Sequence, residues 1–201
     1  ATERMKAGAP PEGRHPPMVA AFAGGVLDFL LDRLRVQLRA EGARHDLVAA
    51  SIGPEGQQDD DITRILSRAA ALQSLMEPDT GRNLLAAYTR ARNILRIEEK
   101  KDGPHSGPVE EAALEAAEER ALNTALTRAE AEVGAALAAE DFPAAMSALA
   151  ALRAPTDEFF EKTLVNDPAF RKNRLRLLSR LRSAMDRVAD LSKIEAQGNM
   201  S

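Results

Sequence analysis

Positive charge is concentrated near the C-terminal end of the sequence, where arginine and lysine side chains could bind the phosphates of a nucleic acid. The stretch Phe170–Glu195 contains eight basic and three acidic residues, whereas the whole chain of 201 residues has a formal net charge of −4. An acidic protein that gathers positive charge on one element is typical of a polyanion-binding site.

Helical periodicity divides this stretch into two sides. Leucines recur at three- and four-residue steps on one side, and a basic stripe lies opposite them, which is either a solvated face or a phosphate-binding face. Arg174 projects toward the apolar side instead. Since a buried guanidinium needs a carboxylate partner, we predict a structural ion pair for Arg174, with Asp157 or Glu158 as its partner. The outer stripe consists of Lys172, Arg176, Arg180 and Arg187.

A second basic stretch, Gly81–Lys101, has six basic and two acidic residues. Its basic side chains could contact phosphates, and Asn93 could hydrogen-bond to base edges. Tyr88 falls on the apolar side of the same helical pattern, so we predict that it belongs to the core. The basic side chains of this stretch are Arg82, Arg90, Arg92, Arg96, Lys100 and Lys101.

Residues with the spacing of a catalytic site are missing. The chain has no cysteine, and its three histidines lack metal-ligand spacing. The dipeptide His45-Asp46 is better interpreted as a helix cap or surface pair than as part of a metal site. Paired carboxylates are frequent, but no apolar pattern surrounds them to raise a pKa for acid-base chemistry. The pattern favours a binding module over an enzyme.

Alanine and leucine dominate the composition, and aromatic residues make up only 3%. This mixture predicts an all-α, multi-helix bundle. No apolar run approaches the ~20 residues of a membrane span. Residues 1–18 are rich in Pro, Gly and Ala and are predicted to be a linker or loosely ordered segment. The predicted helices cover 18–40, 44–51, 62–76, 81–97, 110–140, 143–153, a short helix from Thr156 or Asp157, and 170–195, with loops at 52–61 and 101–109.

Three blocks together resemble a known family. Phe29–Val48 (FLLDRLRVQLRAEGARHDLV), Asn83–Arg96 (NLLAAYTRARNILR) and Asp157–Glu195 are similar, in order and spacing, to the C-terminal part of the β subunit of bacterial glycyl-tRNA synthetase. The resemblance covers the chain from about residue 19. It implies a helical anticodon-binding domain of the DALR type over 19–201, with leading helices at 19–78 and a DALR-like core at 79–201.

The resemblance also implies the activity of the intact enzyme, which joins glycine to its tRNA with ATP and Mg²⁺ in the cytoplasm. In that family the catalytic site lies in the α subunit, so we expect neither catalytic residues nor a cofactor in this chain. The expected partners are glycine tRNA and the α subunit, and we expect no membrane and no DNA as partners. An alternative is a structural module that braces the β subunit or contacts the α subunit.

The family's motif of a basic residue before Asn-Ile-Leu matches Arg92 to Leu95, and its Leu-Arg-x-Asn-Arg-Leu motif matches Phe170 to Leu175, with phenylalanine in place of the first leucine. The connection at 163–168 is shorter than is usual in the family. The candidate tRNA-binding side chains are Arg82, Arg90, Arg92, Asn93, Arg96, Lys100, Lys101, Arg171, Lys172, Arg176, Arg180 and Arg187.

Overall fold

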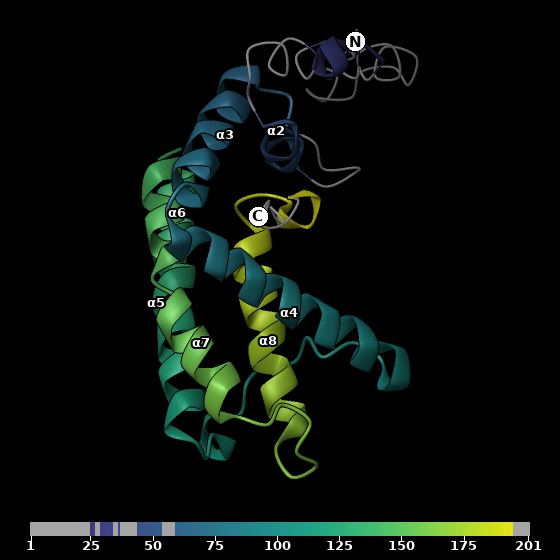
Figure 1. Ribbon diagram of the computed structural model, residues 1–201, viewed down its shortest axis with the longest axis vertical. Coiled ribbons are helices and arrows are strands. Elements are labelled where there is room, and N and C mark those ends of the chain that lie inside the picture. The colour runs from purple at the N-terminus through teal and green to yellow at the C-terminus, as the bar shows by residue number, and fades with distance from the viewer. Residues whose placement is uncertain (1–24, 27–28, 34–35, 37–43, 54–58, 195–201) are drawn as a thin grey trace, which may run out of the picture. The chain divides into compact units, whose positions relative to one another are not determined.

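The computed structural model describes residues 25–26, 29–33, 36, 44–53 and 59–194 (Figure 1). The chain divides into two compact units, 1–42 and 43–201. In the first unit the described residues are helical, as predicted, and Leu31 is buried whereas Phe29 is exposed. The predicted linker at 1–18 and the remainder of the 18–40 helix lie outside the described residues.

The second unit is built from helices, and its described residues include no strand, which confirms the predicted all-α class. Two of the boundaries follow from local signals. The carboxylate of Asp61 accepts the amide of Arg64 at the start of the 62–76 helix, and Asp141 accepts the amide of Ala144 in the same way. The elements are α2 (His45–Ile52), α3 (Ile62–Met76), α4 (Asp79–Asp102), the 3₁₀ turn η1 (Glu111–Ala113), α5 (Ala117–Ala138), α6 (Phe142–Ala150), α7 (Arg153–Lys162), α8 (Arg171–Asp186) and the 3₁₀ turn η2 (Leu191–Lys193).

The predicted single helix at 110–140 is wrong, because its first turns are replaced by η1 and an extended segment. Asn173 of α8 holds this segment by accepting the amide of Glu110 (2.8 Å) and donating to its carbonyl oxygen (3.0 Å). The carboxylate of Glu119 then accepts the amides of Glu115 and Ala116, so that α5 begins at Ala117. Tertiary contacts override the helical propensity of this segment.

The last predicted helix is shorter than expected, and the fourth is longer. α8 ends at Asp186, after which the chain turns so that the amide of Asp190 donates to Ala50 in α2 (2.9 Å). α4 continues to Asp102, beyond the predicted end at residue 97, and stops at Gly103, whose φ of 86° suits glycine.

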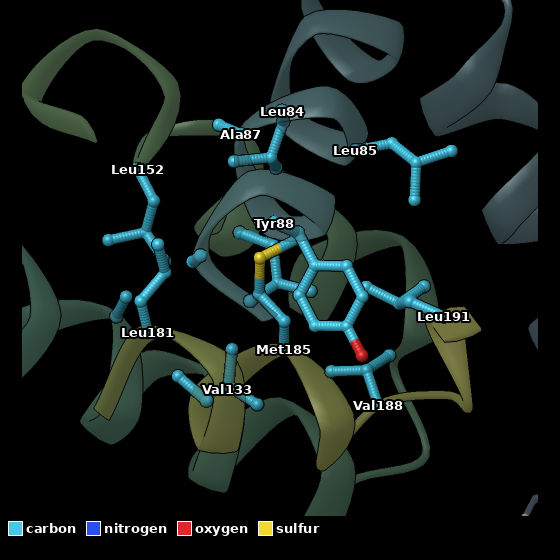
Figure 2. Packing of buried hydrophobic residues seen from close by; sticks show 14 of the residues in the cluster. Leu84, Leu85, Ala87, Tyr88, Val133, Leu152, Leu181, Met185, Val188 and Leu191 are labelled. Carbon is cyan, nitrogen blue, oxygen red and sulfur yellow. The ribbon is translucent and has the colours of Figure 1, made fainter. Parts of the chain in front are cut away.

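α8 packs against both α4, which crosses it, and α5 (Figure 1). α5 also packs against α6 and α7, and α3 packs against α2, α4 and α6. Figure 2 shows Tyr88 of α4 beside Met185 of α8 and near Val188 and Leu191, which follow α8 in the chain. Its hydroxyl donates to Asp186 (2.6 Å), which confirms that Tyr88 belongs to the core.

The buried ion pair predicted for Arg174 is present, but its partner is Glu119 of α5 rather than Asp157 or Glu158. Both side chains are almost inaccessible, with 8% and 1% of their surfaces exposed. The guanidinium of Arg174 also donates to the carbonyl oxygen of Leu164 (2.7 Å). The predicted partners are wrong because α7 packs so that Asp157 instead pairs with Arg153 on the surface of its own helix.

Replacing Glu119 with glutamine is expected to lower the free energy of unfolding by about 3–5 kcal/mol, because Arg174 would keep a buried charge without a counter-charge. Chemical denaturation of the purified chain measures this. Glu118→Gln is the matched control, since Glu118 pairs with the exposed Lys162 and should be nearly neutral. Equal stability losses in the two variants would contradict the role assigned to the buried pair.

α3 and α4 meet at a close backbone contact. A Cβ atom added to Gly81 would overlap the carbonyl oxygen of Leu75, which belongs to the backbone of α3 and has no room to move. Gly134 in α5 is different, because its nearest neighbour would be the flexible end of Arg187, at 3.3 Å from the added Cβ.

Gly81→Ala is therefore expected to destabilise the chain by about 1–3 kcal/mol, although alanine is the better helix former. Gly134→Ala should raise the stability by up to about 1 kcal/mol, since the arginine can shift and the helix gains propensity. Thermal and denaturant unfolding of the two variants tests this. The two substitutions should change the stability in opposite directions. A stabilised Gly81→Ala variant would show that α3 and α4 do not approach as described.

Candidate nucleic-acid interface

The outward face of α4 is basic. Its inward face is buried through Leu84, Tyr88, Ala91 and Leu95, and the opposite face is exposed to solvent. Four-residue spacing brings successive side chains of this face about 6 Å apart along the helix axis. The periodicity of the sequence predicts a polar stripe of Arg82, Thr89, Asn93 and Arg96 on this helix, and these four side chains are exposed, as are Arg92 and Lys100 beside them.

Four of these side chains make no direct polar contact within the described part of the chain. Arg92, Asn93, Arg96 and Lys100 form no hydrogen bond or ion pair there, and the charge of Arg92 acts on Asp186 only at longer range. Arg90, next to them, forms a cation–π contact, with its guanidinium 4.3 Å from the centre of the Phe160 ring. These groups are therefore available to a ligand without first breaking a bond within the protein.

The acidic residues in the last two turns of α4 pair with α8, whereas Asp79 at its start pairs with Arg82. Glu98 is buried and accepts Lys101 (2.7 Å) and Arg171 (2.6 Å), and Asp102 also pairs with Arg171 (2.6 Å). Glu99 pairs with Arg182 (2.9 Å). Hydrogen bonds from Lys101 and then Arg171 hold the pKa of Glu98 below its ordinary value, and Arg171 does the same to the pKa of Asp102.

This arrangement separates the charges of α4 by face. The carboxylates in its last two turns are neutralised on the side of α8, and its unpaired cations lie on the side of solvent. The exposed face therefore keeps a positive potential although the chain as a whole is acidic.

The basic stripe predicted on the outside of α8 is only partly exposed, because Arg176 and Arg180 face the segment before α5 and α5 itself. Arg176 is only 13% exposed and pairs with Glu110 (2.6 Å). Arg180 binds Glu130 and Asn123, each at 2.6 Å. A helical projection separates apolar from polar sides, but it cannot tell solvent from a polar neighbouring helix.

The twelve candidates thus fall into two groups. One group is engaged within the protein: Arg171, Arg176 and Arg180 as described, Lys101 with Glu98, Arg82 with Asp79 and the carbonyl oxygen of Glu77 (2.5 Å), and Arg187 with the carbonyl oxygen of Glu130 (3.2 Å). The other group is exposed and makes no hydrogen bond or ion pair among the described residues: Arg90, Arg92, Asn93, Arg96 and Lys100 on α4, and Lys172 on α8.

The structure also presents residues that the sequence analysis did not select. Phe160, at the end of α7, supports Arg90, and the connection at 163–166 faces it across a hollow. The pair Phe159-Phe160 stands out in a chain so poor in aromatic residues and could have drawn attention to this position. Nothing in the sequence, however, placed the pair beside α4.

Other kinds of site find little support. Among the described residues, no group of three or more histidine or acidic side chains is placed to bind a metal ion. His45 begins α2, and Asp46 pairs with Arg44 (2.6 Å). None of the helices in the described ranges combines the length and the apolar character that crossing a membrane would need.

The sequence profile of the DALR anticodon binding domain matches residues 84–200, which include most of α4 and all of α5 to α8. The chain belongs to the DALR anticodon-binding domain family. The exposed basic face of α4 therefore lies on a domain whose family is named for binding the anticodon.

Relatives of known name are similar over most of the chain. The glycine–tRNA ligase beta subunit of Rhodospirillum centenum is 51% identical over 176 residues, which is 86% of this chain and 24% of that protein. The beta subunit of Phenylobacterium zucineum is 50% identical over 182 residues, or 89% of this chain and 26% of the relative. These findings confirm the resemblance, and this DALR chain spans about a quarter of the length of these curated relatives.

The two groups of cations should respond differently to mutation. Arg171→Gln is expected to lower the thermal midpoint, because buried Glu98 loses its guanidinium partner, whereas Arg92→Gln should leave the midpoint unchanged. Differential scanning calorimetry of both variants measures this. A midpoint that falls as much for Arg92→Gln as for Arg171→Gln would contradict the division into engaged and available side chains.

Proposed function

We propose that this chain is the part of a glycine–tRNA ligase β subunit that binds the anticodon arm of glycine tRNA, through the exposed face of α4. The observation that carries the proposal is the row of unpaired Arg92, Asn93, Arg96 and Lys100 on a DALR domain. The names of the relatives support the choice of tRNA.

Binding would divide between two kinds of contact. Arg92, Arg96 and Lys100 recur every fourth residue along α4 and would meet phosphates along one strand of the arm. Asn93 lies within the same row, where its amide can donate to and accept from a base edge. Because these side chains have no partner within the described protein, binding costs no internal ion pair.

The whole enzyme, on this proposal, joins glycine to tRNA with ATP and Mg²⁺ in the cytoplasm. The reaction would take place on the α subunit, and this chain would contribute affinity and orientation of the tRNA rather than catalytic groups. Binding energy from such a remote contact helps to hold the reacting end of a substrate in place.

Replacing both Arg92 and Arg96 with glutamine should weaken binding of glycine tRNA and lower the slope of log affinity against log salt by about two, since two phosphate contacts are lost. Fluorescence titrations of the 201-residue chain over a range of salt concentrations measure both quantities.

The matched control is the double variant Arg128→Gln and Arg153→Gln, which removes the same charge from α5 and α7. Each of these arginines forms a surface pair within its own helix, to Glu132 and Asp157 respectively, and should affect binding little. If both double variants weakened tRNA binding equally, the binding would be a non-specific attraction to positive charge rather than a contact with α4. Unchanged affinity in the α4 variant would favour the alternative of a structural module that braces the β subunit or contacts the α subunit.

A further inference from the structure

A hollow of about 490 Å³ adjoins the basic face of α4. It is lined by Arg90 and Ile94 of α4, by Phe160, Glu161 and Lys162 at the end of α7, and by the connection at 163–166 between α7 and α8. The volume lies within the range of pockets for small planar ligands, about 300–1,000 Å³. Arg90 is one helical turn from Asn93, so the hollow opens beside the row of unpaired side chains.

Arg90 is held as a flat platform in this hollow. Its guanidinium lies over the ring of Phe160, which is only 8% exposed, whereas Arg90 itself is exposed. The aromatic ring supports the guanidinium from one side, and the exposure of Arg90 leaves the group accessible to a ligand. A guanidinium supported in this way offers a preformed surface on which a planar base can stack.

The facing connection carries polar groups that the described protein leaves unused. The amide of Asp167 donates to Leu164 (3.1 Å) and closes a turn with Val165 and Asn166 at its corners. In the described part of the chain, the amides of Val165 and Asn166 have no backbone acceptor. The side chain of Leu164 is 72% exposed, which adds an apolar contact at the rim.

We propose that this hollow binds one unstacked base of the tRNA anticodon loop, stacked on the open face of Arg90 with its edge toward the 164–166 turn. This inference rests on the proposed function and goes beyond it by naming a pocket for a single base. Phosphates bound along α4 would bring the RNA strand to the rim, and stacking would draw one base from the loop into the hollow.

A double-mutant cycle between protein and RNA tests the stacking. The protein change is Arg90→Lys, which keeps the charge and the cation–π contact with Phe160 but removes the planar surface. The RNA change is an abasic nucleotide, placed at each position of the anticodon loop of a glycine tRNA stem-loop in turn. Titrations of the 201-residue chain with every combination give the coupling between the two changes.

At one loop position, the abasic change is expected to lower affinity about tenfold for the unchanged protein and hardly at all for Arg90→Lys. Arg96→Lys is the matched control, because a phosphate contact tolerates lysine and should show no coupling at any position. Each cycle compares two RNAs on the same protein, so a partly unfolded variant does not distort it.

The outcomes separate this inference from the proposed function. If the unmodified stem-loop binds and Arg90→Lys is additive with every abasic position, the base pocket is wrong while the tRNA-binding function stands. If neither the stem-loop nor glycine tRNA binds, both proposals fall.

Discussion

The pairing of Arg174 with Glu119 fixes the centre of this bundle. Neither charge is exposed enough to be solvated, so each requires the other. The same carboxylate accepts the amides of Glu115 and Ala116, so it also sets the first residue of α5, and the same guanidinium binds the carbonyl of Leu164. One contact therefore sets the register of α8 against α5 and anchors the connection that leads into α8. The position of α4, which packs on the other side of α8, depends on this register.

The arginines of α8 act mainly inside the protein, and this explains how an acidic chain presents a basic surface. Arg171 and Arg182 take up the carboxylates of α4, whereas Arg176 and Arg180 take up those of α5 and the segment before it. What remains unpaired on α4 is cationic. The charge that would meet RNA thus lies on α4, while the most basic helix of the sequence makes that charge available by neutralising its neighbours.

Local signals in the sequence predicted much of the fold, and contacts between distant segments account for the errors. α3 was predicted with its observed bounds because Asp61 and Pro78 mark its ends, and Tyr88 was placed correctly by its periodicity. The break before α5 was missed, because the Ala/Glu-rich residues on both sides of it have similar helical propensity. The segment before α5 is held out of the helix by its contact with Asn173, which lies far along the chain. Arg180 was placed outside because periodicity does not reveal that α5 covers that side. The hollow beside Arg90 brings α4 to a loop far along the chain, which no local pattern predicts.

The late place of α8 in the chain has a consequence for synthesis on the ribosome. α5, α6 and α7 follow one another in sequence and pack together, so they can associate as they emerge. α4 can pack against α3, α6 and α7 by then, but the faces of α4 and α5 that contact α8 lack their partner until α8 has been translated. During that interval the leucines of these faces and the carboxylate of Glu119 stay without their contacts to α8. Cooperative folding of this domain therefore waits for its last helix, and a chain released before α8 would expose surfaces prone to aggregation.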